Sequence, residues 1–423
     1  MNLNWHGLRA VVLQSDDWGL CAWSPDEQAF RVLADTPAFR SAPGARYGRS
    51  TLESADDVRQ LRQLLVEFRG GDSFPPVWQA NTIVSSPDYE RLTPPLFQVD
   101  PLPLVDAPCT PSRWRRPGLW EEVDEAREAG VWWPELHGLH HLPETAWLDA
   151  LRRGIADARR AHEQQSPICQ AVEASGEYDP REPWEVRARN LELALEKFRA
   201  LFGRQASSFC PPDYRWDDRL EAHAESLGLS TVQGKGEQVG PRLPKLRRLL
   251  RRYRWPDPAA TRFYLPVRIA FEPGSVHRLP TVQMIEAVHR AARAAWGRGQ
   301  PAVISTHRVN YARLDPERAK EGRTALADLL KRLAEDGARF LADQEVRALQ
   351  ERSWSLREVG SRGVLVRYFG APREPVRFPA RPGATGLVAR EGHGLENVEG
   401  KVEGEEAVVR ADVGEYLLEW TSP

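Results

Sequence analysis

Continuous apolar runs alternate with amphipathic stretches along the first 350 residues. Residues 8–13 and 77–84 have the unbroken apolar character of buried strands, and residues 53–68 repeat their apolar positions with helical spacing. The same alternation predicts helices at 119–128, 142–162, 184–202, 217–227, 281–296 and 316–335, and strands at 131–137, 168–174, 206–210, 229–233, 264–271, 301–306 and 338–341. Repeated strand-then-helix units of this kind indicate a parallel sheet, either open or closed into a barrel.

The pattern changes near residue 353. Short segments of alternating polarity follow, separated by turns rich in glycine and proline, at 360–369, 376–378, 386–390, 405–413 and 415–420. Such segments are typical of an all-β domain. We therefore predict two domains: an α/β domain over residues 1–352 and a small β-sandwich over residues 353–423.

Composition supports a folded protein and excludes few functions. The 423 residues suffice for a large barrel with a small domain, and 41% hydrophobic with 28% charged residues is typical of a globular chain. A net charge of -2 gives no reason to expect nucleic acid or an anionic membrane as partner. No segment has the roughly 18 to 20 apolar residues of a membrane span.

The N-terminus and the cysteines bear on location. The first residues lack a basic segment followed by an apolar one, so we expect no signal peptide and a cytoplasmic protein, although a secreted chain that has lost its signal would look the same. The four cysteines are scattered without CxxC spacing, as expected for reduced thiols. A basic run at 242–254 has one apolar helical face; we favour an amphipathic helix with a solvated basic side over a contact for an anionic polymer or membrane.

Two adjacent carboxylates, Asp16 and Asp17, follow the first apolar run. Alone, such a pair favours a turn or a helix cap. Like charges side by side raise one another's pKa unless a cation separates their roles. A bound metal would do so, because one carboxylate could bind it while the other remained a free base.

Three histidines lie in five positions at the end of the strand expected at 131–137. His137 and His141 are four residues apart, and with Asp17 they would form a site of two imidazoles and one carboxylate that leaves positions open for water and substrate. Spacing alone does not separate His141 from His140 as the second ligand.

Two later strand ends also carry polar residues. The strand at 206–210 runs into Pro211 and Pro212, which fix a rigid turn, and the strand at 301–306 ends at His307. In a barrel, the carboxyl ends of the strands form the active site. We therefore expect all four strand ends to meet.

These motifs, in this order, resemble a known family. Asp16-Asp17-Trp18-Gly19, then His-x-x-x-His, then Phe-x-Pro-Pro, then a strand ending in His are similar to the polysaccharide deacetylases of carbohydrate esterase family 4, within the glycoside hydrolase/deacetylase barrel superfamily. The resemblance covers roughly residues 8 to 345. It implies a distorted barrel of seven or eight strands and one divalent metal, usually zinc, bound by Asp17, His137 and His141. It also implies Asp16 as general base and His307 as general acid.

The chain departs from the family at several points. The family usually has Ser or Thr where this chain has Gly138, and an Arg that tunes the base where this chain has Cys210. Arg215 or Arg308 are the candidates to replace that arginine. The tryptophan motif of the family has no clear match.

The resemblance implies hydrolytic removal of an N-acetyl group, or another N-acyl group, from an amino sugar or polysaccharide. A backbone N–H near Asp213 or Tyr214 is expected to hold the oxyanion. The side chains that we expect to contact a carbohydrate substrate are Trp18, Asp213, Tyr214, Trp216, Arg308 and Asn310.

Two other functions fit parts of the pattern. A glycoside hydrolase on a related barrel would need two carboxylates about 5 to 9.5 Å apart, and Glu135, Glu173 and Glu177 are the candidates. A carbohydrate-binding protein on a decayed barrel would need none of the motifs. Their presence argues against that function.

Overall fold

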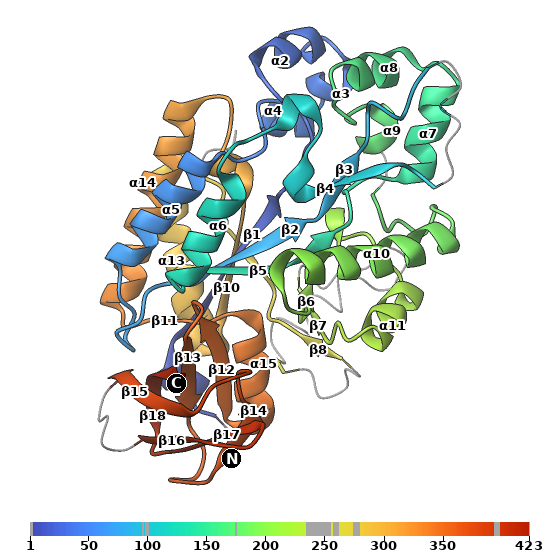
Figure 1. Ribbon diagram of the computed structural model, residues 1–423. Coiled ribbons are helices and arrows are strands. Elements are labelled where there is room, and N and C mark those ends of the chain that lie inside the picture. Colours follow the sequence, from blue (N-terminus) through green and yellow to red (C-terminus); the bar gives the residue numbers. More distant parts are fainter. Residues whose placement is uncertain are drawn as a thin grey trace.

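A nine-stranded parallel sheet lies at the centre of the α/β part of the computed structural model (Figure 1). The structure describes residues 3–94, 97, 101–173, 176–233, 255–256, 262–273, 280–392 and 398–422. Eight strands follow the order β8-β7-β6-β5-β2-β1-β10-β9, and β11 pairs with the start of β1. Their bounds are β1 Ala10–Trp18, β2 Trp78–Ile83, β5 Trp132–Gly138, β6 Ser208–Phe209, β7 Thr231–Val232, β8 Phe263–Tyr264, β9 Ile269–Ala270, β10 Ala302–His307 and β11 Arg339–Phe340.

The sheet is a half-barrel whose two ends belong to one short segment. The strand expected at 264–271 divides into β8 and β9, which lie at opposite ends of the strand order. Leu265 N–H still bonds to Val232 of β7, whereas Phe271 N–H bonds to Ser305 of β10. Pro266, which has no N–H to donate, falls at the crossing. The residues between the two strands, Arg268 among them, therefore pass from one end of the sheet to the other.

Helices cover the sheet as the amphipathic stretches predict. The predicted helices at 119–128, 184–202 and 316–335 are found with these bounds, as α6 Leu119–Glu128, α10 Trp184–Phe202 and α14 Pro316–Glu335. The others are α5 Ala55–Glu67, α11 Asp218–Ser226 and α13 Thr281–Gly297, with α1 Trp5–Leu8 at the start. Their ends follow ordinary capping chemistry: Ser54 and Asp57 form a capping box on α5, and Gly203 ends α10 in the left-handed region.

Six short helices, which we name the cap, lie over the carboxyl ends of the strands (Figure 1). They are α2 Glu27–Leu33, α3 Pro37–Arg40, α4 Ala42–Tyr47, α7 Glu144–Arg152, α8 Ala156–Glu163 and α9 Gln170–Glu173. The cap has its own apolar cluster, which includes Trp23, Phe39 and Trp147. Two predictions fail here: the strand expected at 168–174 contains α9, and the single helix expected at 142–162 is interrupted at Gly154, which adopts a positive φ of 72°.

Other short elements connect the layers. The stretch 86–118 contains the strand pair β3 Ser85–Pro87 and β4 Leu104–Asp106 and the 3-10 turns η1 Ala107–Cys109 and η2 Ser112–Trp114. Two further turns, η3 Pro212–Tyr214 and η4 Arg308–Asn310, follow β6 and β10. The predicted basic helix at 242–254 lies outside the described residues. None of the described helices is long and apolar enough to cross a membrane.

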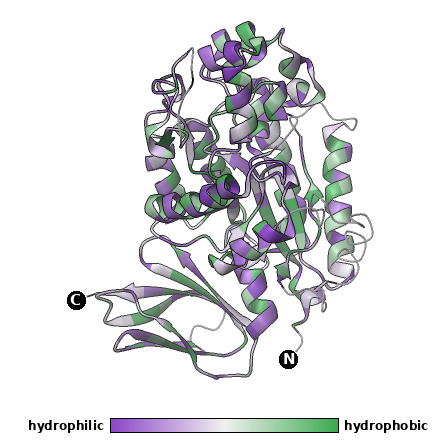
Figure 2. Ribbon diagram, turned by 90° about the vertical axis from the view of Figure 1, so that its right-hand side faces the viewer, coloured by the Kyte–Doolittle hydropathy of each residue, from purple (hydrophilic) through white to green (hydrophobic). Residues whose placement is uncertain are grey.

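A β-sandwich follows α15 (Asp343–Arg352), at the end of the barrel opposite the cap (Figures 1 and 2). One sheet has the order β12-β13-β18-β15 and the other β14-β17-β16, and every pairing is antiparallel. The strands are β12 Trp354–Val359, β13 Gly363–Tyr368, β14 Val376–Pro379, β15 Gly386–Gly392, β16 Val398–Glu403, β17 Glu406–Ala411 and β18 Gly414–Thr421. The predicted fold class, a distorted (β/α) barrel with a C-terminal β-sandwich, is thereby confirmed; α15, β12 and β16 were not foreseen.

Candidate active site

The two adjacent carboxylates lie inside β1 rather than after it, because the strand runs on to Trp18. The register between β1 and β2 shifts between Ser15 and Trp18, and Asp17 adopts a φ of 75°. Successive side chains of a regular strand point to opposite faces, and a bulge breaks that alternation. Asp16 and Asp17 consequently both line one cavity of about 530 Å³ beneath the cap.

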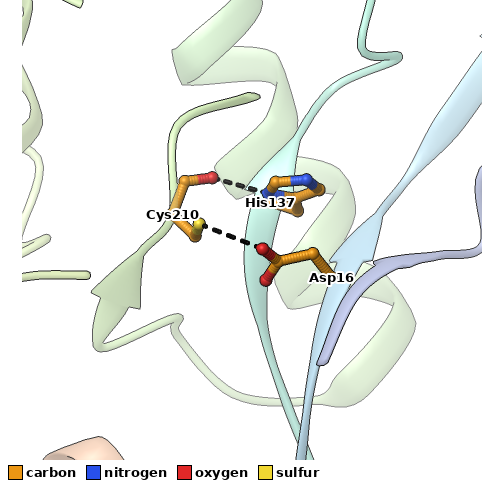
Figure 3. Close-up of side chains that lie close together, drawn as sticks. All are labelled: Asp16, His137 and Cys210. Carbon is orange, nitrogen blue, oxygen red and sulfur yellow. Dashed lines mark hydrogen bonds between the residues drawn. The ribbon is translucent and has the colours of Figure 1, made fainter. Parts of the chain in front are cut away.

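Asp17, His137 and His141 form the centre of this cavity. Asp17 Oδ1 lies 3.3 Å from His137 Nε2 and 3.8 Å from His141 Nε2, and a ligand atom of each residue lies within 4.8 Å of the others. His137 Nδ1 is 2.7 Å from the Cys210 carbonyl oxygen (Figure 3), which can only accept, so Nδ1 carries a proton and Nε2 is the nitrogen that faces Asp17. Two imidazoles and one carboxylate fit a divalent cation such as Zn²⁺.

The structure distinguishes the two neighbouring histidines. His140 is buried away from the cavity, where its Nε2 lies 3.6 Å from Glu144 and its Nδ1 accepts the Leu142 N–H at 3.1 Å. His141 adopts a φ of 63°, which turns its ring to Asp17. The geometry thus favours His141 as the candidate ligand.

Glu177 holds the loop that carries these histidines. Its carboxylate accepts the N–H groups of Leu139 at 3.0 Å, His140 at 3.3 Å and His141 at 2.7 Å. A Cβ on Gly138, whose φ is 155°, would stand 2.7 Å from Glu177 Oε2. This explains why Ser or Thr, the usual residue of the similar family, does not fit at position 138.

Arg268 supplies the cation beside Asp16. Its Nη1 and Nη2 lie 2.6 and 3.1 Å from the two carboxylate oxygens, and Asn81 donates to Asp16 Oδ1 at 2.6 Å. Burial opposes ionisation of Asp16, but the attractions of Arg268, His137 and His307 together outweigh it and hold the pKa of this carboxyl well below its usual value. Neither Arg215 nor Arg308, the two expected candidates, pairs with Asp16.

The two expected arginines pair elsewhere. Arg215 bonds to Asp179 at 3.0 Å, and Arg308 is buried against Glu53 at 3.0 Å. Arg268 did give a signal in the sequence, because it is the single charged residue in the apolar stretch 264–271.

A second group of possible ligands, Asp16, His137 and Cys210, lies behind the first (Figure 3). Cys210 Sγ is 3.8 Å from Asp16 Oδ2. A thiol binds metal as thiolate, yet burial raises the pKa of Cys210, and both oxygens of Asp16 are already bonded to Arg268. The first group is therefore the better cation site.

His307, on the other side of Asp16, is held by Glu272. Its Nδ1 lies 2.5 Å from Glu272 Oε1, and Glu272 is held in turn by Arg46 at 2.8 Å and Asn310 at 2.7 Å. His307 Nε2 is 4.0 Å from Asp16 Oδ2. Burial disfavours the imidazolium, but the charge and hydrogen bond of Glu272, with the charges of Asp17 and Asp16, outweigh it and raise the pKa of His307, as suits a proton donor.

The expected substrate-binding residues divide into two groups. Asp213 and Tyr214 line the cavity, with φ values of 55° and 54°. Trp18 and Trp216 do not: Trp18 is 1% exposed and packs edge-on against Trp132 at 4.7 Å, and the Trp216 indole donates to Glu221 at 2.8 Å. Both indoles are buried in the core, so the expected substrate contact is wrong for them.

The remaining two expectations also change. Arg308, fully buried against Glu53, does not line the cavity, and Asn310 supports Glu272 rather than facing substrate. Four side chains of the site escaped sequence reasoning: Arg46 and Tyr47 come from the cap, and Arg268 and Glu272 follow the inserted segment at 234–263. Only the fold brings these segments to the strand ends.

The candidate glycosidase carboxylates do not form a pair in the cavity. Glu135 accepts the N–H groups of Ser207 at 2.9 Å and Ser208 at 3.0 Å, and Glu177 holds the histidine loop. Of the three, only Glu173 lines the cavity.

Comparison with known proteins gives weak likenesses. No protein-family model and no curated protein sequence matches the chain. A Mycobacterium smegmatis structure, provisionally described as a polysaccharide deacetylase, matches with 15% identity and a TM-score of 0.40 over 80% of this chain and 90% of its own. Agd3, described as a novel carbohydrate deacetylase, matches with 11% identity and a TM-score of 0.40 over 98% of this chain, which spans 65% of Agd3.

An Anoxybacillus α-amylase also matches, with 7% identity and a TM-score of 0.30 over 100% of this chain and 99% of its own. Likenesses at these values do not identify a function.

Proposed function

We propose that this protein is a metal-dependent hydrolase that removes an N-acyl group, acetyl in the simplest case, from an amino sugar or polysaccharide. One observation carries the proposal: a two-histidine, one-carboxylate group shares one cavity with an ionised carboxylate and a histidine prepared to donate. Amide hydrolysis needs a base, an acid and a Lewis acid in this arrangement.

Asp17, His137 and His141 would hold the ion, with His137 fixed by Cys210 and the loop of His141 fixed by Glu177. A divalent ion such as Zn²⁺ polarises a carbonyl and lowers the pKa of water to about 7. This help matters here, because Arg268 keeps Asp16 ionised but makes it a weaker base.

The other groups handle protons. Asp16 takes a proton from the attacking water as the water oxygen bonds to the acyl carbon. His307 gives a proton to the amide nitrogen as the C–N bond breaks. Glu272 bonds to Nδ1 of His307, which leaves Nε2 for the leaving amine. The products are a carboxylate and a free amine.

The test is acyl release from N-acylated sugars by the zinc-loaded chain. Asp16→Asn should retain bound zinc and lower kcat by about 100-fold or more, in line with general-base contributions. His307→Ala should also retain zinc, and its kcat should fall most for substrates with poor leaving groups. Release of reducing ends without acyl release would point to a glycoside hydrolase instead.

A further inference from the structure

The cavity has a second half that the proposed chemistry does not use. Part of its wall is aliphatic and aromatic, and we name this part the apolar chamber. It is lined by Leu20, Ala22, Trp23, Leu142, Ile168 and Val172. These side chains are 1% to 9% exposed and belong to the apolar cluster of the cap.

A sugar ring fits this wall poorly. Hydroxyl groups that face aliphatic side chains lose their bonds to water without replacement, which costs affinity. Glu173 is the polar side chain at this end, and its Oε1 is already 2.7 Å from Ser41 Oγ. The chamber is therefore suited to a hydrocarbon group.

The strand order decides which part of the substrate faces the chamber. His307 ends β10, on one side of β1, whereas His137 and His141 follow β5, on the other side beyond β2. The leaving nitrogen must face His307, its proton donor, so the acyl group points to the histidine-ligand side. Leu142, next to His141, begins the chamber on that side.

We infer that the chamber binds the hydrocarbon part of an N-acyl group longer than acetyl. The natural substrate class is then an amino sugar, or a similar amine, that carries a medium-length fatty acyl amide. This inference rests on the proposed function and refines it. Each buried methylene group improves binding by about fourfold.

The test compares kcat/KM for glucosamine carrying acetyl, butyryl, hexanoyl and octanoyl amides, with the zinc-loaded full chain. We expect kcat/KM for the hexanoyl amide to exceed that for the acetyl amide by at least about 10-fold. This is less than the increase that full burial of the extra methylene groups would give. Val172→Phe fills the chamber and should lower the hexanoyl-to-acetyl ratio by about 10-fold. Val282→Phe, at a side chain 63% exposed on α13, is the matched control and should leave the ratio unchanged.

If Val172→Phe does not fold, Val172→Ala serves instead, because a larger chamber should raise the octanoyl-to-hexanoyl ratio. The chamber would be overturned if acetyl release exceeded hexanoyl release and no chamber variant changed the hexanoyl-to-acetyl ratio. The proposed hydrolase function would then still stand. Absence of release from every amide by zinc-loaded protein would overturn the proposed function itself.

Discussion

Two groups of buried charges lie at opposite ends of the barrel. The cavity cluster contains the carboxylates of Asp16, Asp17 and Glu272, the arginines Arg46 and Arg268, and His137, His141 and His307. The interdomain cluster joins the barrel to the sandwich and contains Asp72, Glu345, Glu415, Arg357 and Arg367. Both combine buried carboxylates with arginines, so this charge pattern alone does not distinguish a site from a joint.

Pairing and backbone geometry do distinguish them. In the interdomain cluster Arg367 reaches Asp72, Glu345 and Glu415, Arg357 bonds to Glu345 at 3.0 Å, and the guanidiniums also bond to main-chain carbonyls. In the cavity cluster the ion pairs found for Asp17 among the described residues are with imidazoles alone. Five residues that line the cavity also have positive φ values, a strain typical of functional sites: Asp17, Trp23, His141, Asp213 and Tyr214. A cation would complete the cavity cluster, whereas the interdomain cluster is already complete.

The largest expected effect concerns the proposed cation. His141→Ala should abolish zinc binding and lower acyl release by about 1,000-fold or more, because several kcal/mol of transition-state stabilisation depend on the ion. Zinc content and kcat/KM are the measurements. The stability of the zinc-free protein should change little.

His140→Ala is the matched control from the adjacent position. It removes the buried imidazole that lies 3.6 Å from Glu144 and 3.4 Å from Asn190 and should lower the free energy of unfolding, yet folded protein should keep its zinc. Loss of zinc in this variant, with zinc retained in His141→Ala, would reverse the assignment.

The opposite pattern is expected at the interdomain cluster. Arg367→Met leaves Asp72 and Glu345 without their shared cation and should lower the free energy of unfolding by about 3 to 5 kcal/mol. Urea unfolding measures this loss, and kcat/KM of the folded protein should not change. Arg377→Met, which removes an exposed pair with Glu403 and Glu406, is the control and should leave stability unaltered. Equal losses in the two variants would show that the buried joint has no special role.

The sequence predicts those parts of the molecule whose signals lie within a single segment of the chain. The helices at 119–128, 184–202 and 316–335 are set by periodicity within one segment, and Asp16, Asp17, His137, His141 and His307 by motifs at strand ends. The partners Arg268, Glu272 and Arg46 were missed because their roles depend on contacts across the barrel. The interdomain cluster was missed for the same reason: Asp72 and Arg367 are 295 residues apart.

Asp343 connects the two clusters. It lies in the first turn of α15, two residues before Glu345, and its carboxylate accepts from Gln14 and Gln79 at 2.7 Å each, while Gln14 accepts from Arg268 at 2.6 Å. Burial raises the pKa of Asp343 to about 6, although the hydrogen bonds from the glutamines act in the opposite direction. The folded state then binds this proton more tightly than the unfolded state, so ionisation of Asp343 destabilises the fold as pH rises through this range.

The free energy of unfolding should accordingly fall by up to about 3 kcal/mol through this one group between about pH 4 and pH 7. Asp343→Asn does not titrate and should lack this component. Urea unfolding of both proteins across the range gives the difference, in which the other titrating groups cancel. A difference that stays constant with pH would contradict the shift.

The smallest expected effect is at Gly138, where the cavity cluster depends on the Glu177 carboxylate, which accepts from N–H groups of the histidine loop. A methyl group at position 138 would stand 2.7 Å from Glu177 Oε2 and 3.1 Å from Pro212, so Gly138→Ala must move Glu177 or the loop that carries His141. Zinc affinity should fall by about 10-fold, the lower end of what a lost supporting contact costs a metal site. Gly203→Ala tests the backbone alone, because Gly203 has a φ of 71° and nothing within 4 Å of its Cβ position. It should lower stability slightly and leave zinc affinity unchanged; an equal fall in zinc affinity in both variants would mean that general strain, and not the contact with Glu177, sets the geometry of the ligands.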